Sequence, residues 1–239
     1  MDSHATPTYT QNHTHAETAM QPPSVATPAG RTAAASRVLR NTYALLSLTL
    51  LFSAGIAAVS AAAQWPAPGI LLSLAGNLGL LFVIYRLKNS AWALPAVFGL
   101  TGFMGYTLGP LLSKVMTLPG GGQVIAMALA ATGAVFLALS AWALTTRRDF
   151  SVMGGFLFAG MVVALLAGLA AVFLQIPALG LAVSAMVALL SAGLILVETS
   201  RIVHGGESNY VLATVGLYVS IFNLFTSLLS LFGLGGSDE

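Results

Sequence analysis

From residue 42 onward the sequence is a series of long apolar runs separated by short polar breaks. Of the 239 residues, 57% are hydrophobic and only 7% are charged, whereas a soluble domain carries about 25% charged residues to face water. Apolar runs of about 20 residues have the length that crosses a lipid bilayer. The chain is therefore predicted to be an all-α membrane protein whose main partner is the surrounding lipid bilayer.

Seven runs have this length, and each break between them contains proline, glycine or charged residues. At a rise of about 1.5 Å per residue, runs of about 17–23 residues cross about 26–35 Å, which matches a hydrocarbon core of about 30 Å. We predict a bundle of seven transmembrane helices within residues 37–234, followed by a short C-terminal tail at 235–239. The predicted spans lie near residues 42–63, 69–85, 91–112, 123–144, 152–174, 178–200 and 210–232.

The basic residues fall almost entirely on one side of this seven-span arrangement. Lys114 alone falls on the opposite side from the other eight, which are Arg31, Arg37, Arg40, Arg86, Lys88, Arg147, Arg148 and Arg201. Loops rich in Lys and Arg stay in the cytoplasm. The N-terminus is therefore predicted to be cytoplasmic and the C-terminus to lie on the outer side of the membrane.

Residues 1–36 differ in composition from the rest of the chain. They are rich in Thr, Ala, Pro, His and Gln and show no apolar periodicity, so we expect a disordered cytoplasmic tail. The Ala-rich stretch at 60–63 resembles a signal-peptide cleavage site. However, the first apolar run starts past residue 40 and is about 22 residues long, which favours an uncleaved membrane anchor.

Polar residues inside the last two predicted spans recur at helical spacing. Ser184, Ser191 and Glu198 are seven residues apart, so they share one face of the sixth span. In the seventh span the residues on one face include Ser220, Asn223 and Ser227. These two neighbouring faces are predicted to form a polar stripe in the bundle interior. The alternative is that the serines only hold the helices together through hydrogen bonds, at about 0.6 kcal/mol each.

Among the acidic residues, Glu198 alone falls inside a predicted span. A charged side chain within a membrane span is costly and therefore indicates a functional ionisable site. The alternative is a carboxylate near the membrane interface that pairs with Arg201, three residues later on the same helix.

Several kinds of chemistry are disfavoured by the composition. The sequence contains no cysteine, which excludes disulfides and thiolate ligands. The four histidines, at 4, 13, 15 and 204, lie outside the predicted spans, so an intramembrane serine hydrolase would lack its base. No basic stripe indicates nucleic-acid binding. We expect neither an enzyme nor a bound metal or cofactor.

Two further features indicate where the helices approach one another. In the third span Gly105 and Gly109 have the GxxxG spacing of close helix contacts. The last two spans are joined by a short loop at 201–208, so they should be antiparallel neighbours.

Several ordered motifs resemble the Bax inhibitor-1 family. Residues 197–206 (VETSRIVHGG) and 217–229 (LYVSIFNLFTSLL) resemble its last two helices. Its bacterial YccA branch is similar to three further segments, at 40–43 (RNTY), 85–90 (YRLKNS) and 101–110 (TGFMGYTLGP). The likeness covers about residues 37–234.

This resemblance implies a seven-helix bundle with a central last helix, in the bacterial inner membrane. It implies a role as substrate and modulator of the membrane AAA protease FtsH, engaged through the N-terminal tail. The alternative it implies is a pH-sensitive calcium or cation leak, because some relatives have a latch of two aspartates and an arginine. By position this latch corresponds to Glu198, Ser220 and Arg86, and Ser220 cannot ionise. One carboxylate among hydroxyls is a poor calcium site.

Overall fold

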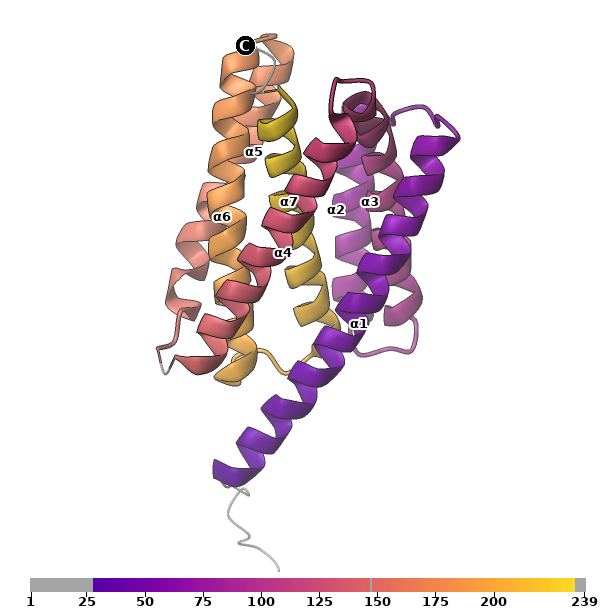
Figure 1. Ribbon diagram of the computed structural model, residues 1–239. Helices are drawn as coiled ribbons and strands as arrows, with labels where there is room; N and C mark the ends of the chain where they lie inside the picture. Colours follow the sequence, from indigo (N-terminus) through magenta and orange to yellow (C-terminus); the bar gives the residue numbers. More distant parts are fainter. Residues whose placement is uncertain (1–27, 147, 235–239) are drawn as a thin grey trace, which may run out of the picture.

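The computed structural model describes residues 28–146 and 148–234, with only the backbone described for residues 28–34 and 234. The predicted C-terminal tail and most of the predicted N-terminal tail lie outside the described residues. The helices are α1 (Pro28–Ala62), α2 (Ile70–Leu87), α3 (Ala93–Met116), α4 (Gly121–Thr145), the short 3-10 helix η1 (Ser151–Met153), α5 (Gly154–Phe173), α6 (Pro177–Val203) and α7 (Tyr210–Leu234). Figure 1 shows them as a bundle of long, steeply inclined rods.

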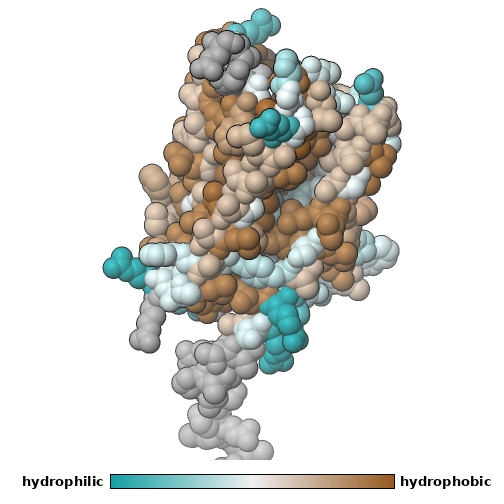
Figure 2. Space-filling model, viewed as in Figure 1, coloured by the Kyte–Doolittle hydropathy of each residue, from teal (hydrophilic) through white to brown (hydrophobic). Residues whose placement is uncertain are grey.

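The prediction of seven transmembrane helices is confirmed. In the described part of the chain, seven helices are long and apolar enough to cross a membrane, and no strand is present. The space-filling view shows apolar side chains over the flanks, with hydrophilic residues gathered toward the two ends (Figure 2). A surface of this kind matches a hydrocarbon layer between two aqueous phases.

Helix α1 begins earlier than the sequence indicated. It starts at Pro28, inside the segment 1–36 that was predicted to be a disordered tail. Two local preferences explain this correction. Proline suits the first position of a helix, where its missing N–H is not needed, and the alanines that follow are the best helix formers.

The turn between α6 and α7 makes these two helices antiparallel neighbours. After α6, Gly205 takes a left-handed conformation at φ 76°, which glycine adopts without steric cost. Asn209 then caps α7, because its Oδ1 accepts hydrogen bonds from the N–H groups of Val211 at 2.9 Å and Leu212 at 3.3 Å. The side-chain amide nitrogen Nδ2 of Asn209 donates to the carbonyl oxygen of Lys88 at 2.9 Å. This bond ties the start of α7 to the end of α2.

Helix α7 occupies the centre of the bundle, as the family resemblance implied. It packs against α1, α3, α4 and α6. Of the residues in an 18-residue apolar stretch of α7, 50% are buried, compared with 6–39% in the corresponding stretches of the other spans. The Tyr218 side chain of α7 is 1% exposed, and its hydroxyl hydrogen-bonds the Ser53 hydroxyl of α1 at 2.5 Å and the Thr101 carbonyl of α3 at 3.3 Å. The core therefore forms around the last helix of the chain.

Glycines bring α1 and α3 into close contact, as the GxxxG spacing predicted. A Cβ at Gly105 would lie 2.5 Å from the Ser53 carbonyl oxygen, and one at Gly109 would lie 2.9 Å from the Ala61 backbone nitrogen. Only glycine fits at these two positions, because both neighbours are backbone atoms of α1. Helices α2 and α5 are peripheral and pack mainly against α3 and α6, respectively.

Candidate functional site

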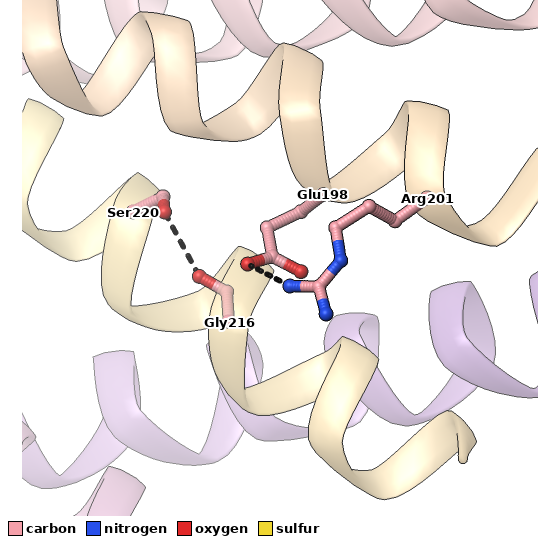
Figure 3. A network of polar contacts seen from close by, with 4 residues as sticks. All are labelled: Glu198, Arg201, Gly216 and Ser220. Atoms are coloured by element: carbon pink, nitrogen blue, oxygen red, sulfur yellow. Dashed lines mark hydrogen bonds and ion pairs between the residues drawn. The ribbon is translucent and has the colours of Figure 1, made fainter. Parts of the chain in front are cut away.

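The Glu198 carboxyl group lies between α6 and α7, against a glycine of the central helix. A Cβ added at Gly216 would lie 2.9 Å from the carboxyl carbon and 3.0 Å from Oε2 of Glu198. The missing side chain at position 216 is thus what makes room for the carboxyl group beside α7. Figure 3 shows Glu198 directed at this point of α7.

Glu198 pairs with Arg201 on its own helix. Nη1 of Arg201 lies 3.7 Å from Oε1 of Glu198, and the two side chains are 40% and 17% exposed, respectively (Figure 3). Both residues lie within the last two turns of α6, which ends at Val203. This is the arrangement that the sequence analysis gave as the alternative for Glu198, a carboxylate near the end of a span with a cation one turn away.

Arg86, the expected latch partner, is not paired with Glu198 in the described part of the chain. Arg86 is exposed at the end of α2, and α2 packs against α3. Among the described residues, no ion pair joins Arg86 to Glu198. The family resemblance implied this pair by position in the sequence, which does not fix the lateral position of α2 relative to α6. The lateral neighbour of Glu198 is the central helix α7, and its cation comes from its own helix.

Ser220, the position of the second latch carboxylate, lies one turn from Gly216 on α7. Its hydroxyl donates to the Gly216 carbonyl oxygen at 2.9 Å (Figure 3), and it is 3% exposed. The hydroxyl is therefore satisfied within its own helix. No hydrogen bond joins it to Glu198 in the described part of the chain, so the two positions are neighbours without a direct polar contact.

The rest of the predicted polar stripe is partly interior. Ser191 and Ser227 are buried, at 0% and 6% exposure, while Ser184 and Asn223 are half-buried. Ser184 donates to the carbonyl oxygen of Gly180 within α6. The Ser191 hydroxyl is buried and has no hydrogen-bond partner among the described residues.

The functional groups in this region decide which reactions and ligands it can support. It combines one carboxylate, one guanidinium and several hydroxyl groups. In the described part of the chain, no three His, Cys, Asp or Glu side chains gather where they could hold a metal ion. The arrangement can bind or release a proton, or hold helices together, but it lacks the several carboxylate oxygens that a divalent cation prefers.

A second polar cluster, which the sequence analysis did not anticipate, joins the loop after α4 to the end of α6. The Ser200 hydroxyl accepts from the Phe150 N–H at 3.0 Å and donates to Oδ1 of Asp149 at 3.3 Å. Nδ1 of His204 lies 2.9 Å from the Ser200 carbonyl oxygen and 3.3 Å from its hydroxyl. The spacing of four residues between Ser200 and His204 was the only signal of this cluster in the sequence.

This cluster does not have the geometry of a catalytic triad. In a triad the acid holds the far nitrogen of the histidine, whereas here Asp149 contacts the serine. Ser200 is 0% exposed, so no substrate reaches its hydroxyl. The Ser151 N–H donates to Asp149 and holds the pKa of that exposed carboxyl below its usual value. The cluster is a tether that keeps the α4–α5 loop on α6.

Comparison with known proteins places this bundle in a family. The model of the family described as "Inhibitor of apoptosis-promoting Bax1" matches residues 35–237. The chain belongs to the Bax inhibitor-1 family. The match covers every predicted membrane span and leaves out the N-terminal residues, so it confirms the resemblance and its extent.

Within the Bax inhibitor-1 family, the chain has close bacterial relatives. It is 53% identical over 204 residues to an uncharacterized protein of Pseudomonas aeruginosa, covering 85% of this chain and 92% of the relative. It is 52% identical over 202 residues to the Escherichia coli K12 protein named modulator of FtsH protease YccA, covering 84% of this chain and 92% of the relative. A membrane protein of Vibrio cholerae is 44% identical over 211 residues, which are 87% of this chain and 94% of the relative.

Proposed function

We propose that this protein is an inner-membrane modulator of an FtsH-type AAA protease. The observation that carries the proposal is the 52% identity, over most of both chains, to the relative named as a modulator of that protease. A relative in a second Escherichia coli strain, also 52% identical over 202 residues, is named an inner membrane protein. The role is one of binding and regulation, and it needs no catalytic residue.

The N-terminal segment supplies the handle in this proposal. A membrane-anchored AAA protease grips an unfolded segment on the cytoplasmic side. Residues 1–27 precede α1 and have the low-hydrophobicity composition of chains that cannot form a core. The eight-to-one distribution of basic residues supports a cytoplasmic location for them.

Orientation is tested first, because the handle must lie on the protease's side. The natural chain has no cysteine, so Ser24→Cys and Ser237→Cys each introduce a single thiol. An impermeant thiol reagent added outside cells with a permeabilised outer membrane should label Ser237→Cys and leave Ser24→Cys unlabelled. Labelling of Ser24→Cys alone would reverse the topology and remove the handle from the cytoplasm.

The handle is then tested by deleting residues 2–27, which stops short of Pro28, where α1 begins. The protein should live longer in cells that contain the protease, because it loses the segment from which degradation starts. Its lifetime in cells without the protease should not change. Equal half-lives for the full and shortened chains in protease-containing cells would show that the N-terminal segment is not the handle.

A pH-sensitive cation leak is the second candidate function. The observation that favours it is the Glu198 carboxyl, 17% exposed, inside a membrane-spanning helix and against the central helix α7. Proton binding at this group would remove its attraction to Arg201 and change the charge between α6 and α7. Calcium flux into liposomes that contain the purified protein, measured across pH, separates the two candidates. Flux that rises in acid, and that is already high at neutral pH in Glu198→Gln because glutamine mimics the protonated carboxyl, would favour the leak. The absence of flux at every pH would exclude it.

A further inference from the structure

Helices α1 and α4 run beside each other across the front of the molecule without packing closely, and α7 lies behind the space between them (Figure 1). This space is an open crevice of about 340 Å³. We call it the α1–α4 crevice. Its walls are Leu50, Leu51 and Ala54 of α1 and Leu129, Gly133 and Phe136 of α4, and its floor includes Tyr218, Ile221 and Phe225 of α7.

The position of the crevice across the membrane decides whether water or lipid reaches it. Leu50 and Ala54 lie in the middle of the α1 span at 35–62, and Leu129 and Phe136 lie in the middle of the α4 span at 121–145. The crevice therefore opens into the hydrocarbon core of the membrane. Leu51 and Leu129, at its rim, are 73% and 56% exposed, so the opening faces the lipid from the side.

The lining of the crevice favours a hydrocarbon chain as its occupant. Most of the lining residues are Leu, Ile, Phe, Ala or Gly, and the opening faces the lipid. An acyl chain that lies in the crevice restores the contacts that the lining side chains lack across an empty gap.

Positive charge lies at one end of the crevice. Arg40 is exposed and shares one face of α1 with the crevice-lining positions, because the residues at 40, 43, 47, 50 and 54 recur every three or four positions. Ten residues separate Arg40 from Leu50, which is about 15 Å along the helix. This is about half of a hydrocarbon core, so Arg40 lies at headgroup depth.

A second arginine lies at the same end of the flanking helix. Arg148 is exposed just beyond the end of α4 at Thr145. Arginine is well suited to phosphate, because its guanidinium group donates two parallel hydrogen bonds. Between these arginines and the crevice, the rings of Tyr43 and Phe136 approach to 5.9 Å between centroids. An occupant that contacts both the arginines and the crevice must therefore lie on the lipid-facing side of this ring pair.

We propose that the α1–α4 crevice binds one acyl chain of a membrane phospholipid, with Arg40 and Arg148 as partners of its phosphate. The occupant combines an anionic head with a hydrocarbon tail, and the site offers guanidinium groups and an apolar channel at matching depths. Because the bound chain contacts α7 directly, the lipid would stabilise the central helix against α1 and α4.

Gly133 provides a way to fill the crevice without disturbing the bundle. A Cβ at Gly133 would meet no atom within 4 Å, so Gly133→Leu places its side chain in the space that the acyl chain would take. Gly79 of α2 is the matched control, because it is exposed and a Cβ there also meets nothing within 4 Å. Helix α2 contributes no residue to the crevice.

The test uses the full chain in liposomes of phosphatidylethanolamine and phosphatidylglycerol. A trace of the phosphatidylglycerol carries a photoreactive diazirine midway along one acyl chain, and the cross-linked peptides are mapped by mass spectrometry. The adducts should concentrate on residues 50–54 of α1, 129–136 of α4 and the facing part of α7. Gly133→Leu should reduce them about fivefold through loss of the packing contacts, while Gly79→Leu should leave them unchanged.

Two further variants complete the design. Gly133→Ala fills less of the crevice and should give an intermediate loss, which keeps the test valid if Gly133→Leu fails to fold. Arg40→Gln combined with Arg148→Gln should also lower the adducts, because the phosphate loses both partners. Adducts spread evenly over all lipid-facing helices, equal yields in Gly133→Leu and Gly79→Leu, or cross-links to a second copy of the chain in place of lipid would overturn the proposal.

Discussion

The contact between α1 and α3 predicts that alanine lowers the free energy of unfolding at one glycine and does not lower it at another. Gly109 of α3 and Gly79 of α2 both lie inside helices. Alanine is the better helix former by about 1 kcal/mol, so helix propensity alone favours alanine at both positions. The surroundings differ, because a Cβ at Gly79 meets nothing within 4 Å, whereas one at Gly109 would overlap the Ser60 side chain and lie 2.9 Å from the Ala61 backbone nitrogen.

The magnitude for Gly109→Ala follows from these contacts. Forcing an extra methyl group into a packed interface costs about 1–3 kcal/mol, and the upper part of this range applies because a backbone atom cannot rotate away. The Ser60 hydroxyl also donates to the Tyr106 carbonyl at 3.1 Å, and losing this bond costs about 0.6 kcal/mol. After the gain in helix propensity, we expect a net loss of about 2 kcal/mol in the free energy of unfolding.

Equilibrium unfolding in detergent micelles, followed by circular dichroism as a denaturing detergent is added, measures both variants against the natural chain. Gly109→Ala should unfold at a lower denaturant fraction, and Gly79→Ala should unfold at the same or a higher one. If Gly109→Ala is as stable as Gly79→Ala, the close approach of α1 and α3 at Gly109 is refuted.

Three further predictions concern polar contacts of the bundle. In a double-mutant cycle of Ser53→Ala and Tyr218→Phe, the coupling energy should be about 0.6–1.7 kcal/mol, and additive losses would exclude the hydrogen bond between them. Asn209→Ala should lower the free energy of unfolding by about 1–2 kcal/mol, because α7 loses its cap. Asn209→Ser should lose less, because a serine hydroxyl can also accept at the cap while both variants lose the donor to the Lys88 carbonyl. An equal loss in both variants would contradict the capping role. Glu198→Gln should leave spin-label distances between α2 and α6 unchanged at neutral pH, because the carboxylate pairs with Arg201 on its own helix. A shift of several ångströms would instead support a latch between Glu198 and Arg86.

The spans could be predicted because membrane crossing depends on local composition and length. The predicted seventh span at 210–232 corresponds to α7 at Tyr210–Leu234, and the predicted sixth at 178–200 corresponds to α6 at Pro177–Val203. The GxxxG spacing also predicted a close contact correctly, because glycine leaves a gap on any helix that carries it. The start of α1 was missed, because a polar composition hides the helix propensity of the alanines before Arg37.

The site was less predictable, because it depends on which helices are lateral neighbours. Glu198 stood out as the acidic residue within a span, but the choice between Arg86 and Arg201 as its partner requires the position of α2, which packs on α3. The tether of Asp149, Ser200 and His204 joins residues about fifty positions apart and has no periodic signal. The α1–α4 crevice likewise arises from three helices that are distant in sequence.

The role proposed for the protein is tested most directly by reconstitution with the protease. Purified FtsH is placed in liposomes with a membrane-protein substrate that it degrades, and the degradation rate is measured with and without an equal amount of this chain. The shortened chain that lacks residues 2–27 serves as the matched control. We expect the full chain to slow degradation of the other substrate and the shortened chain to slow it less. An unchanged rate at every ratio of this chain to protease would contradict the proposal that the protein is a modulator of FtsH.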